Sequence, residues 1–412
     1  MYIELPENVK SIIEILDSNG YEAYAVGGCV RDSILGRKPK DWDVTTSALP
    51  YEVKSLFKKT IDTGIKHGTV TVLIKGEGYE VTTYRIDGDY KDGRHPENVK
   101  FSLKLTEDLQ RRDFTINAMA YNDKVGLIDQ FDGMKDLQEG IIRCVGNPSE
   151  RFGEDALRMM RAIRFCAQLG FHMDSNTYKA IVKLAPNIMK VSVERIQVEL
   201  IKTLLSDNPD YVQEFQKTGL FAQILPKVDR ILSDRYKKST LTMLKFSECT
   251  TVLRYAALFH LIGYEDTQEI LKSLKLDNYT IDTVSKLIRY SKNTIEENEP
   301  AVRRALHDYG KDMMNLMLKH KRAVIATKEA ITGISLSAAK KHLIVIENMT
   351  RYIIERGDCF TLKDLDITGN DLKAYGLKGE EIGRVLNLLL DIVIENQKLN
   401  EKQTLVALIE HL

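Results

Sequence analysis

The first twenty residues carry the apolar spacing of an amphipathic helix. The apolar positions follow one another at intervals of three or four residues, and they are Val9, Ile12, Ile13 and Leu16. Residues at these intervals lie on one face of a helix, where they can pack against a core. The pattern predicts that the chain opens with a helix that ends at Gly20.

Short β-rich runs and many turns follow in the first third of the chain. Fifteen of the 25 glycines fall within residues 1–153, and a helical stretch at 30–35 is closed by Gly36. From Pro148 onward the apolar spacing is helical, and we find no repeat of fixed period. The β-rich runs are 24–26, 41–45, 69–74 and 79–84. We therefore predict an α+β protein, with an N-terminal mixed α/β part followed by an all-α part.

The composition is that of an ordinary folded protein. Of 412 residues, 43% are apolar and 29% are charged, and 59 Lys and Arg balance 59 Asp and Glu. A net charge of zero gives no overall field that attracts nucleic acid, so local groups must bind any anionic partner. No apolar run approaches the ~20 residues that span a bilayer, and the N-terminus lacks the cationic start of a signal peptide. The five cysteines are scattered, which argues against disulfides and a cysteine zinc site and favours the cytoplasm.

The segment 25–46 carries the strongest chemical signal. Gly27 and Gly28 stand between a predicted strand and a predicted helix, where backbone N–H groups suit a phosphate, and Arg31 follows one turn later. Asp41 and Asp43 are two residues apart on a predicted strand, so they should point to the same face. Neighbouring carboxylates repel unless a cation lies between them, and Mg²⁺ takes such oxygen ligands together with substrate phosphates. The combination suggests two-metal nucleotidyl transfer.

Glu80, at the start of another predicted strand, is either a third carboxylate beside this pair or a surface acid. Arg111, Arg112 and Asp113 stand at a predicted helix start and offer two guanidinium groups and one acceptor. Guanidinium groups bind phosphate oxygens through paired N–H bonds. The segment is therefore a candidate for binding phosphate oxygens.

A predicted helix after residue 153 carries three arginines at three-residue spacing. Each step drifts around the helix axis, so Arg158, Arg161 and Arg164 cannot share one stripe and can serve different oxygens. The apolar positions between them are predicted to face the core. These positions are Ala156, Leu157, Met160, Ile163 and Phe165.

These motifs, in this order, resemble the class II tRNA nucleotidyltransferases, the CCA-adding enzymes of the DNA polymerase β superfamily. The resemblance covers nearly the whole chain. The motifs that carry it are Gly27-Gly28-Cys29-Val30-Arg31-Asp32 with Asp41-Trp42-Asp43, Gly64-x-x-x-Gly68-Thr69-Val70, Glu80-Val81-Thr82-Thr83, Arg111 to Ala118, Asp129-x-Phe131-x-Gly133, Glu154-Asp155-x-x-Arg158-x-x-Arg161-x-x-Arg164 and Glu194-Arg195-x-x-x-Glu199.

The resemblance implies four parts and a set of roles. The parts are a catalytic head at 1–140, a helical neck with a base-reading helix at 141–206, a helical body at 207–330 and a tRNA-binding tail at 331–412. The substrates would be CTP, ATP and the acceptor stem and 3′ end of tRNA, with Mg²⁺ as cofactor. The implied site residues are Gly28 and Arg31 at the triphosphate, Asp41 and Asp43 at the metal, Asp113 at the ribose, and Arg112, Arg161 and Arg164 as further nucleotide contacts.

Base selection has a chemical explanation on the neck helix. Cytosine and adenine both present an amino donor beside a ring-nitrogen acceptor, whereas guanine and uracil present the reverse. Asp155 would accept from the amino group and Arg158 would donate to the ring nitrogen. The two residues are i and i+3 on a predicted helix, which would place them on one face.

Several alternatives share some of these motifs. A CC-only enzyme is disfavoured because the segment Asp87 to Pro96 resembles the flexible loop of full CCA-adding members, whereas an A-only enzyme stays open. A poly(A) polymerase is a relative, but no strongly basic C-terminal extension is present. A small-molecule nucleotidyltransferase would share the glycines and the carboxylate pair, yet it would not need so much helical chain.

Two features of the C-terminal half are weaker signals. Residues 253–262 resemble a helix that carries a His-Asp metal pair in some relatives, but His260 is followed by Leu261, so we expect no phosphohydrolase activity. A set of cations among helical apolar positions can bind RNA phosphates or simply face solvent. This set is Arg303, Arg304, Lys319, Lys321 and Arg322.

Overall fold

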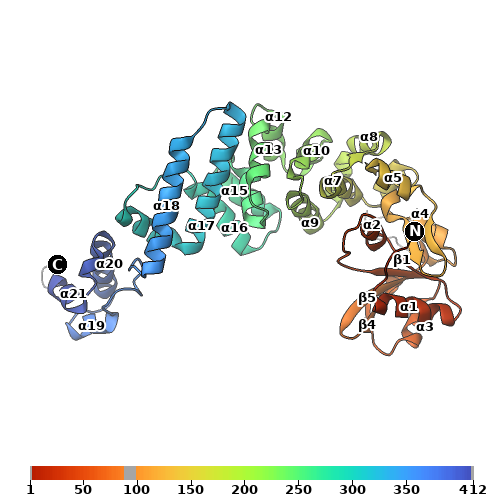
Figure 1. Ribbon diagram of the computed structural model, residues 1–412, viewed down its shortest axis with the longest axis horizontal. Coiled ribbons are helices and arrows are strands. Elements are labelled where there is room, and N and C mark those ends of the chain that lie inside the picture. Colours follow the sequence, from red (N-terminus) through yellow and green to blue (C-terminus); the bar gives the residue numbers. More distant parts are fainter. Residues whose placement is uncertain (1, 88–98, 410–412) are drawn as a thin grey trace. The chain divides into compact units, whose positions relative to one another are not determined.

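The computed structural model describes residues 2–87 and 99–409 (Figure 1). Most of the loop predicted at 87–96 lies outside the described residues. The chain forms two compact units, Met1–Asp234 and Arg235–Leu412. The boundary falls inside the part predicted as the body, and the four-part division stays a prediction. None of the described helices is both long and apolar enough to cross a membrane.

The first unit begins with a seven-stranded mixed sheet in the order β3-β4-β5-β2-β1-β8-β9. β2 and β5 run parallel, and the other neighbouring pairs are antiparallel. The strands are β1 Ala23–Val26, β2 Asp43–Thr46, β3 Thr60–Gly64, β4 Thr69–Ile74, β5 Glu77–Thr83, β8 Met119–Asn122 and β9 Gly126–Asp129. Two pairs lie outside this sheet, the antiparallel β6 Arg85–Asp87 with β7 Val99–Phe101 and the parallel β10 Ile141–Ile142 with β11 His172–Met173.

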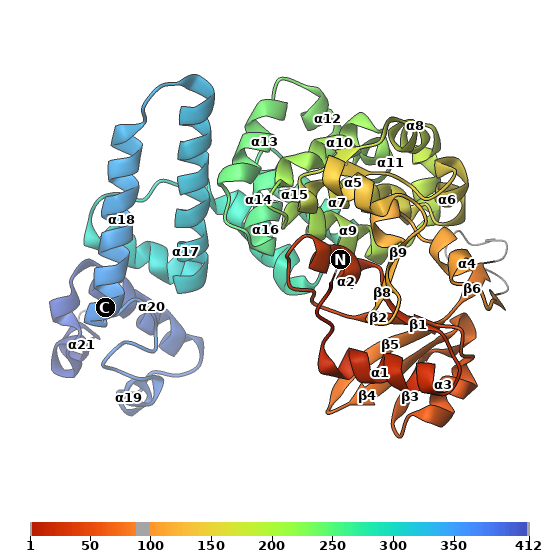
Figure 2. The ribbon, with the colours of Figure 1, turned by 45° about the vertical axis from the view of Figure 1, so that its right-hand side comes forward.

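Helices cover both faces of the sheet near its centre. All four residues of β1 and all four of β8 are buried, as expected for strands that pack on both faces. α1 (Glu7–Ser18) and α3 (Pro50–Leu56) pack side by side on one face, and α2 (Gly28–Ile34) lies on the other (Figure 2). The predicted opening helix is confirmed, because α1 buries the four apolar residues of its pattern.

Helices complete the first unit and make up the second, which confirms the predicted order of a mixed part followed by a helical part. In the first unit they are α4 Leu105–Gln110, α5 Gly133–Glu139, α6 Pro148–Glu154, α7 Leu157–Leu169, α8 Ser175–Leu184, α9 Val193–Leu204, α10 Val212–Lys217, α11 Leu220–Ile224 and α12 Pro226–Ser233, with 3₁₀ turns at Ile65–His67, Thr115–Asn117, Ala185–Lys190 and Pro209–Tyr211. In the second unit they are α13 Lys237–Phe246, α14 Thr251–Phe259, α15 Tyr264–Ser273, α16 Asn278–Tyr290, α17 Glu299–Thr332, α18 Ser337–Arg356, α19 Gly369–Ala374, α20 Glu380–Glu395 and α21 Lys402–Ile409, with a 3₁₀ turn at Gln397–Leu399.

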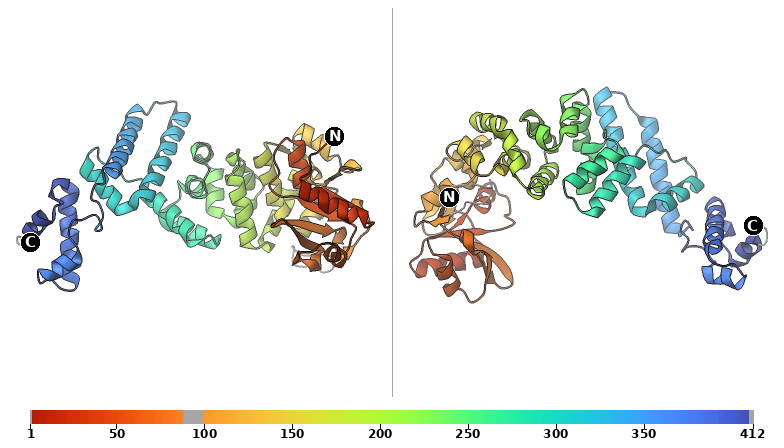
Figure 3. Two further views of the ribbon diagram at one scale, coloured as in Figure 1. Left: turned by 60° about the horizontal axis from the view of Figure 1, so that its bottom comes forward. Right: turned by 180° about the vertical axis from the view of Figure 1, so that it is seen from behind.

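The second unit is built around the long helices α17 and α18, which lie side by side (Figure 3). α17 is kinked at Gly310, whose φ of 77° lies in the region that favours glycine. α19, α20 and α21 enclose a separate apolar core that includes Leu372, Leu389 and Leu405. We call residues 358–409, which hold this core, the terminal bundle.

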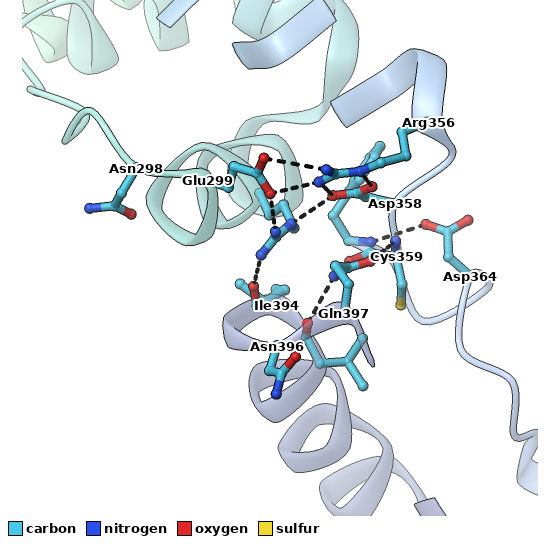
Figure 4. Close-up of polar contacts among 12 residues, drawn as sticks. Asn298, Glu299, Arg356, Asp358, Cys359, Asp364, Ile394, Asn396 and Gln397 are labelled. Atoms are coloured by element: carbon cyan, nitrogen blue, oxygen red, sulfur yellow. Dashed lines mark hydrogen bonds and ion pairs between the residues drawn. The ribbon is translucent and has the colours of Figure 1, made fainter. Parts of the chain in front are cut away.

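Buried Arg303 of α17 contacts the terminal bundle, and Figure 4 labels its partners Glu299, Asp358 and Ile394. The Arg303 guanidinium donates to Asp358 at 2.8 Å, to Glu299 at 2.6 Å and to the carbonyl oxygen of Ile394. Ile394 belongs to the last turn of α20, where carbonyl groups have no partner within the helix. α20 has no basic residue of its own in that turn, so Arg303 supplies the positive charge that a helix C-terminus favours.

We predict that Arg303→Met lowers the free energy of unfolding of the second unit by about 2 kcal/mol, because it removes the donor to the Ile394 carbonyl oxygen and one of the two guanidinium partners of buried Asp358, the other being Arg356. Arg304→Met is the matched control. Arg304 pairs with Asp391 and Glu395 in solvent, so its loss should cost less than about 1 kcal/mol. Urea unfolding measures both values, and hydrogen exchange of α20 amides localises the effect. Equal losses in the two variants would contradict the role given to Arg303.

Candidate active site

The Gly-Gly junction lies where β1 ends and α2 begins. Gly27 has a φ of 84°, a backbone conformation that side-chain-bearing residues rarely adopt. A Cβ atom on Gly27 would also lie 2.9 Å from Nη1 of Arg112. The backbone angle therefore favours glycine at this position, and the tip of the Arg112 side chain approaches it closely.

Asp41 and Asp43 line one cleft with Gly28, Arg31 and Arg164, with a volume of about 570 Å³. Asp43 is the first residue of β2, so the prediction that both acids alternate on one strand is wrong for Asp41, which precedes the strand. The structure nevertheless brings the two carboxylates to the same cleft.

The surroundings of Asp43 disfavour the ionised form of its carboxyl group. Desolvation by the surrounding protein raises its pKa, the Arg112 guanidinium lowers it, and the charges of Glu80 and Asp41 raise it again, with a net increase. Glu80 stands directly opposite Asp43 in the parallel pairing of β2 with β5. Three acids thus act on one another at this edge of the sheet, an arrangement that favours a bound cation.

The protein ligands that this cleft offers to a metal ion are the carboxylates of these acids. Within residues 2–87 and 99–409, no group of three or more His, Cys, Asp or Glu side chains is arranged to hold a metal ion. Asp41 and Asp43 can therefore hold Mg²⁺ only with oxygens from another source, which fits the habit of Mg²⁺ to bind through one or two carboxylates plus substrate phosphates.

The Arg111-Arg112-Asp113 segment follows the end of α4, so the prediction that it begins a helix is wrong. Buried Asp108 accepts hydrogen bonds from both Arg111 and Arg112 and so fixes the two guanidinium groups. Nε of Arg112 is buried and has no hydrogen-bond partner among the described residues.

Asp113 is buried and accepts from three neighbours. Arg161 donates to it at 2.6 and 2.8 Å, the side-chain amide of Asn117 at 3.0 Å and the backbone N–H of Phe114 at 2.9 Å. The charge of Arg161 and these hydrogen bonds hold the pKa of the carboxyl well below its usual range, despite desolvation. Asn117 also accepts from Arg31 at 2.6 Å, which links Arg31 to Asp113.

The helix predicted through Asp155 and Arg158 is interrupted. α6 ends at Glu154 and α7 begins at Leu157, and Asp155 has an extended backbone between them, so the i, i+3 argument for one shared helix face is wrong. Asp155 accepts a bidentate ion pair from Arg195, at 2.7 and 3.2 Å. Arg158 donates to Glu154 and to the carbonyl oxygen of Arg111. Because of this break, Asp155 lies before α7 and Arg158 lies within it, and each side chain is held by its own partners.

Arg161 and Arg164 have different partners, as predicted from their different directions around the axis of α7. Arg161 pairs with Asp113, and buried Arg164 pairs with Glu199 and donates to Gln168. Desolvation and the charge of Arg161 lower the pKa of Arg164 more than Glu199 raises it. The intervening apolar residues are buried, as predicted.

Several residues that organise the site had no assigned role in the sequence analysis. Asn117, Glu199 and Arg195 lie inside quoted motifs, so their positions were known but their partners were not. Asp108 stands four residues before Arg112 on α4, a spacing that can indicate an ion pair. Most of these residues have partners far away in the sequence, such as Arg31, which lies 86 positions before its partner Asn117. The spacing of residues in a motif cannot reveal such pairs.

The weaker candidates of the C-terminal half have internal partners. His260 is half-buried and its ring nitrogens face the carbonyl oxygen of Ala257 and the hydroxyl of Ser239. The five cations are all engaged within the chain: Arg303 and Arg304 as described, Lys319 with Glu248, Lys321 with the carbonyl oxygens of Ser291 and Asn293, and Arg322 with Glu347.

Comparisons with known proteins agree with this architecture. The family model described as "Poly A polymerase head domain" matches residues 23–143, one described as "Probable RNA and SrmB- binding site of polymerase A" matches 170–232, and a model of tRNA nucleotidyltransferase domain 2 matches 247–409. The fold and the site thus define a nucleotidyltransferase with a helical RNA-binding part.

Relatives that match two thirds or more of the chain make the assignment specific. The CCA-adding enzyme of Ligilactobacillus salivarius is 38% identical over 98% of this chain and 96% of its own, and that of Limosilactobacillus reuteri is 45% identical over 68% and 70%. The solved CCA-adding enzyme of Bacillus stearothermophilus, in complex with CTP, is 34% identical with a TM-score of 0.79 over 97% of this chain and 96% of its own. The chain belongs to the family of class II CCA-adding enzymes, which are tRNA nucleotidyltransferases.

We predict that Asp43→Asn raises the melting temperature at pH 7. A carboxyl whose pKa is raised by folding costs stability when it is ionised, so removal of its charge stabilises the protein above its folded pKa. The gain should shrink as the pH falls through that pKa and vanish below the ordinary aspartate value of about 3.9. Thermal unfolding at pH 7 and at pH 3 measures the difference. Asp312→Asn, at an exposed position of α17, should show no such pH-dependent gain, and an equal gain there would refute the explanation.

Proposed function

We propose that the cleft at Asp41 and Asp43 adds C, C and A in turn to the 3′ end of tRNA, with CTP and ATP as substrates. The observation that supports it best is the meeting of two carboxylates from the head with guanidinium groups from head and neck in one cleft. The relative from Bacillus stearothermophilus carries CTP in its solved structure. Cysteines that are few and scattered along the chain suit a cytoplasmic location, which is part of the proposal.

Nucleotide addition requires that the triphosphate of the substrate is held in place while one O–P bond forms and another breaks. The 3′ hydroxyl of the RNA attacks the α-phosphorus of the nucleotide in line, an O–P bond forms, and the bond to the leaving pyrophosphate breaks. Arg31 and Arg164 in the cleft wall stabilise the phosphate oxygens, and Arg112, which lies beside Gly27, is a further donor to them. Bound Mg²⁺, held by Asp41 and Asp43, would supply Lewis-acid stabilisation of the charge that develops on oxygen.

Asp155 and Arg158 are proposed to select the base. Arg195 fixes the Asp155 carboxylate through both oxygens, and Oδ1 also accepts from the backbone N–H of Leu157. A carboxylate has about four acceptor sites, so Asp155 keeps capacity for an amino group of cytosine or adenine. Fixed partners keep both side chains in place, so that they can refuse a base whose donors and acceptors are reversed.

We predict that Asp41→Ala and Asp43→Ala abolish nucleotide addition, by more than about 10³-fold, because the cation site loses half of its protein ligands. The measurement uses tRNA that lacks one, two or three terminal nucleotides, with CTP and ATP alone and together, read at single-nucleotide resolution. The parent protein should add C, C and A and then stop, whereas a poly(A) polymerase would make a longer A tract.

Both variants should keep their fold and their affinity for tRNA. Asp312→Asn serves again as the control and should leave addition unchanged. Near-normal addition by either alanine variant would overturn the assignment of the carboxylate pair.

We predict that Asp155→Ala or Arg158→Ala lowers the use of CTP and ATP together and narrows their advantage over UTP and GTP. A site that pairs with a base edge can discriminate by about 10⁴-fold or more, because a wrong base leaves buried polar groups unpaired. Single-turnover addition with each of the four nucleotides measures the effect. Glu150→Ala, at an exposed position of α6, should keep the parent preference. If an Asp155 or Arg158 variant also keeps it, other residues read the base.

A further inference from the structure

Three guanidinium groups converge on the ring of Phe165, a buried residue of α7. The Cζ atoms of Arg164, Arg31 and Arg161 lie 4.0, 5.0 and 5.4 Å from the ring centroid. Each distance is within the ~6 Å over which a cation is attracted to the face of an aromatic ring. The Phe114 ring meets Phe165 edge to face, with centroids 5.6 Å apart, and limits its freedom.

The three cations around this ring do not form an unbalanced charge cluster. Each has a carboxylate of its own, so three positive charges meet three negative ones. The pairs are Arg31 with Asp32, Arg161 with Asp113 and Arg164 with Glu199. The ring thus lies between cations that are already neutralised, and it can set their spacing without having to offset their repulsion.

Two of these cations face the catalytic cleft from different parts of the first unit. Arg31 comes from α2 beneath the Gly-Gly junction, and Arg164 comes from α7 after the sheet. Both line the cleft that holds Asp41 and Asp43. Phe165 is in cation–π contact with both, so one rigid ring joins a cation of the sheet region to a cation of the helical region.

We propose that Phe165 is a positioning residue for the triphosphate of the incoming nucleotide. It holds the Arg31 and Arg164 guanidinium groups at a fixed spacing in the cleft, so that both reach the same chain of phosphates without first losing side-chain freedom. A long arginine side chain has many rotamers, and a group that is ordered before binding does not lose that conformational entropy on binding. This inference rests on the proposed function, since it assigns a role within the same cleft.

The test is equilibrium binding of CTP, pyrophosphate and CMP to the full chain by calorimetry in the presence of Mg²⁺. Phe165→Leu keeps an apolar side chain but has no aromatic face. It should weaken CTP and pyrophosphate about 5- to 30-fold, the range expected when one or two arginine side chains must be ordered on binding, and change CMP less than about 2-fold. Phe165→Tyr keeps the aromatic face and should stay within about 3-fold of the parent for CTP.

Phe221→Leu is the matched control for the loss of a buried ring. Phe221 is fully buried in α11 and packs on Phe215 with centroids 5.1 Å apart, and no cation–π contact involves its ring among the described residues. It should lower the melting temperature as Phe165→Leu does, yet keep the affinity for CTP. If Phe165→Leu does not fold, Phe165→Met is measured and interpreted in the same way.

Three results would overturn the inference: unchanged CTP affinity in Phe165→Leu, an equal loss for CTP and CMP, or a Phe165→Tyr protein as weak as Phe165→Leu. The last two would assign the effect to packing and not to the triphosphate. Failure of the proposed function looks different, because the parent protein would then bind CTP without extending tRNA.

Discussion

The buried ion pair between Asp113 and Arg161 is the interaction on which the site depends. Asp113 belongs to the segment after α4, and Arg161 belongs to α7, so the pair joins the sheet region to the helices that follow it. A buried charge that loses its partner costs several kcal/mol, which makes the pairing close to obligatory. The head and the following helices accordingly form one compact unit that extends to Asp234.

Other charged groups of the site continue from this pair. Asn117 connects Asp113 to Arg31, and Glu199 lies near Arg161 at 3.7 Å while it binds Arg164. Arg31, Arg161 and Arg164 therefore have preset positions before any substrate arrives. This explains how a chain with no net charge can prepare a local site for a polyanion: it combines fixed guanidinium donors with further cations gathered around the cleft, which are Lys38, Lys40 and Lys202.

Structure that depends on residues close together in the sequence could be predicted, whereas contacts between residues far apart in the sequence could not. The helix at residues 7–18 and the strand at 69–74 follow from apolar spacing, since every residue that defines them is a near neighbour. The break at Asp155 could not be predicted in this way, because the residue that holds the Asp155 carboxylate is Arg195, 40 positions later. The site residues could be listed from ordered motifs, but their partners required the fold.

The contact of Arg303 with the last turn of α20 has a consequence for how the C-terminal region can vary between relatives. α20 takes the cation at its C-terminus from a residue 91 positions earlier, so the end of α20 depends on α17. A terminal bundle exchanged between relatives would keep its own apolar core, yet the carbonyl oxygen of Ile394 would lose its guanidinium donor unless an arginine also stood at position 303 of the recipient. We therefore expect an exchange of C-terminal regions to be tolerated better when the junction lies before α17 than when it lies between α17 and α20. The connection after α18 would otherwise be the natural junction, because the terminal bundle has its own apolar core.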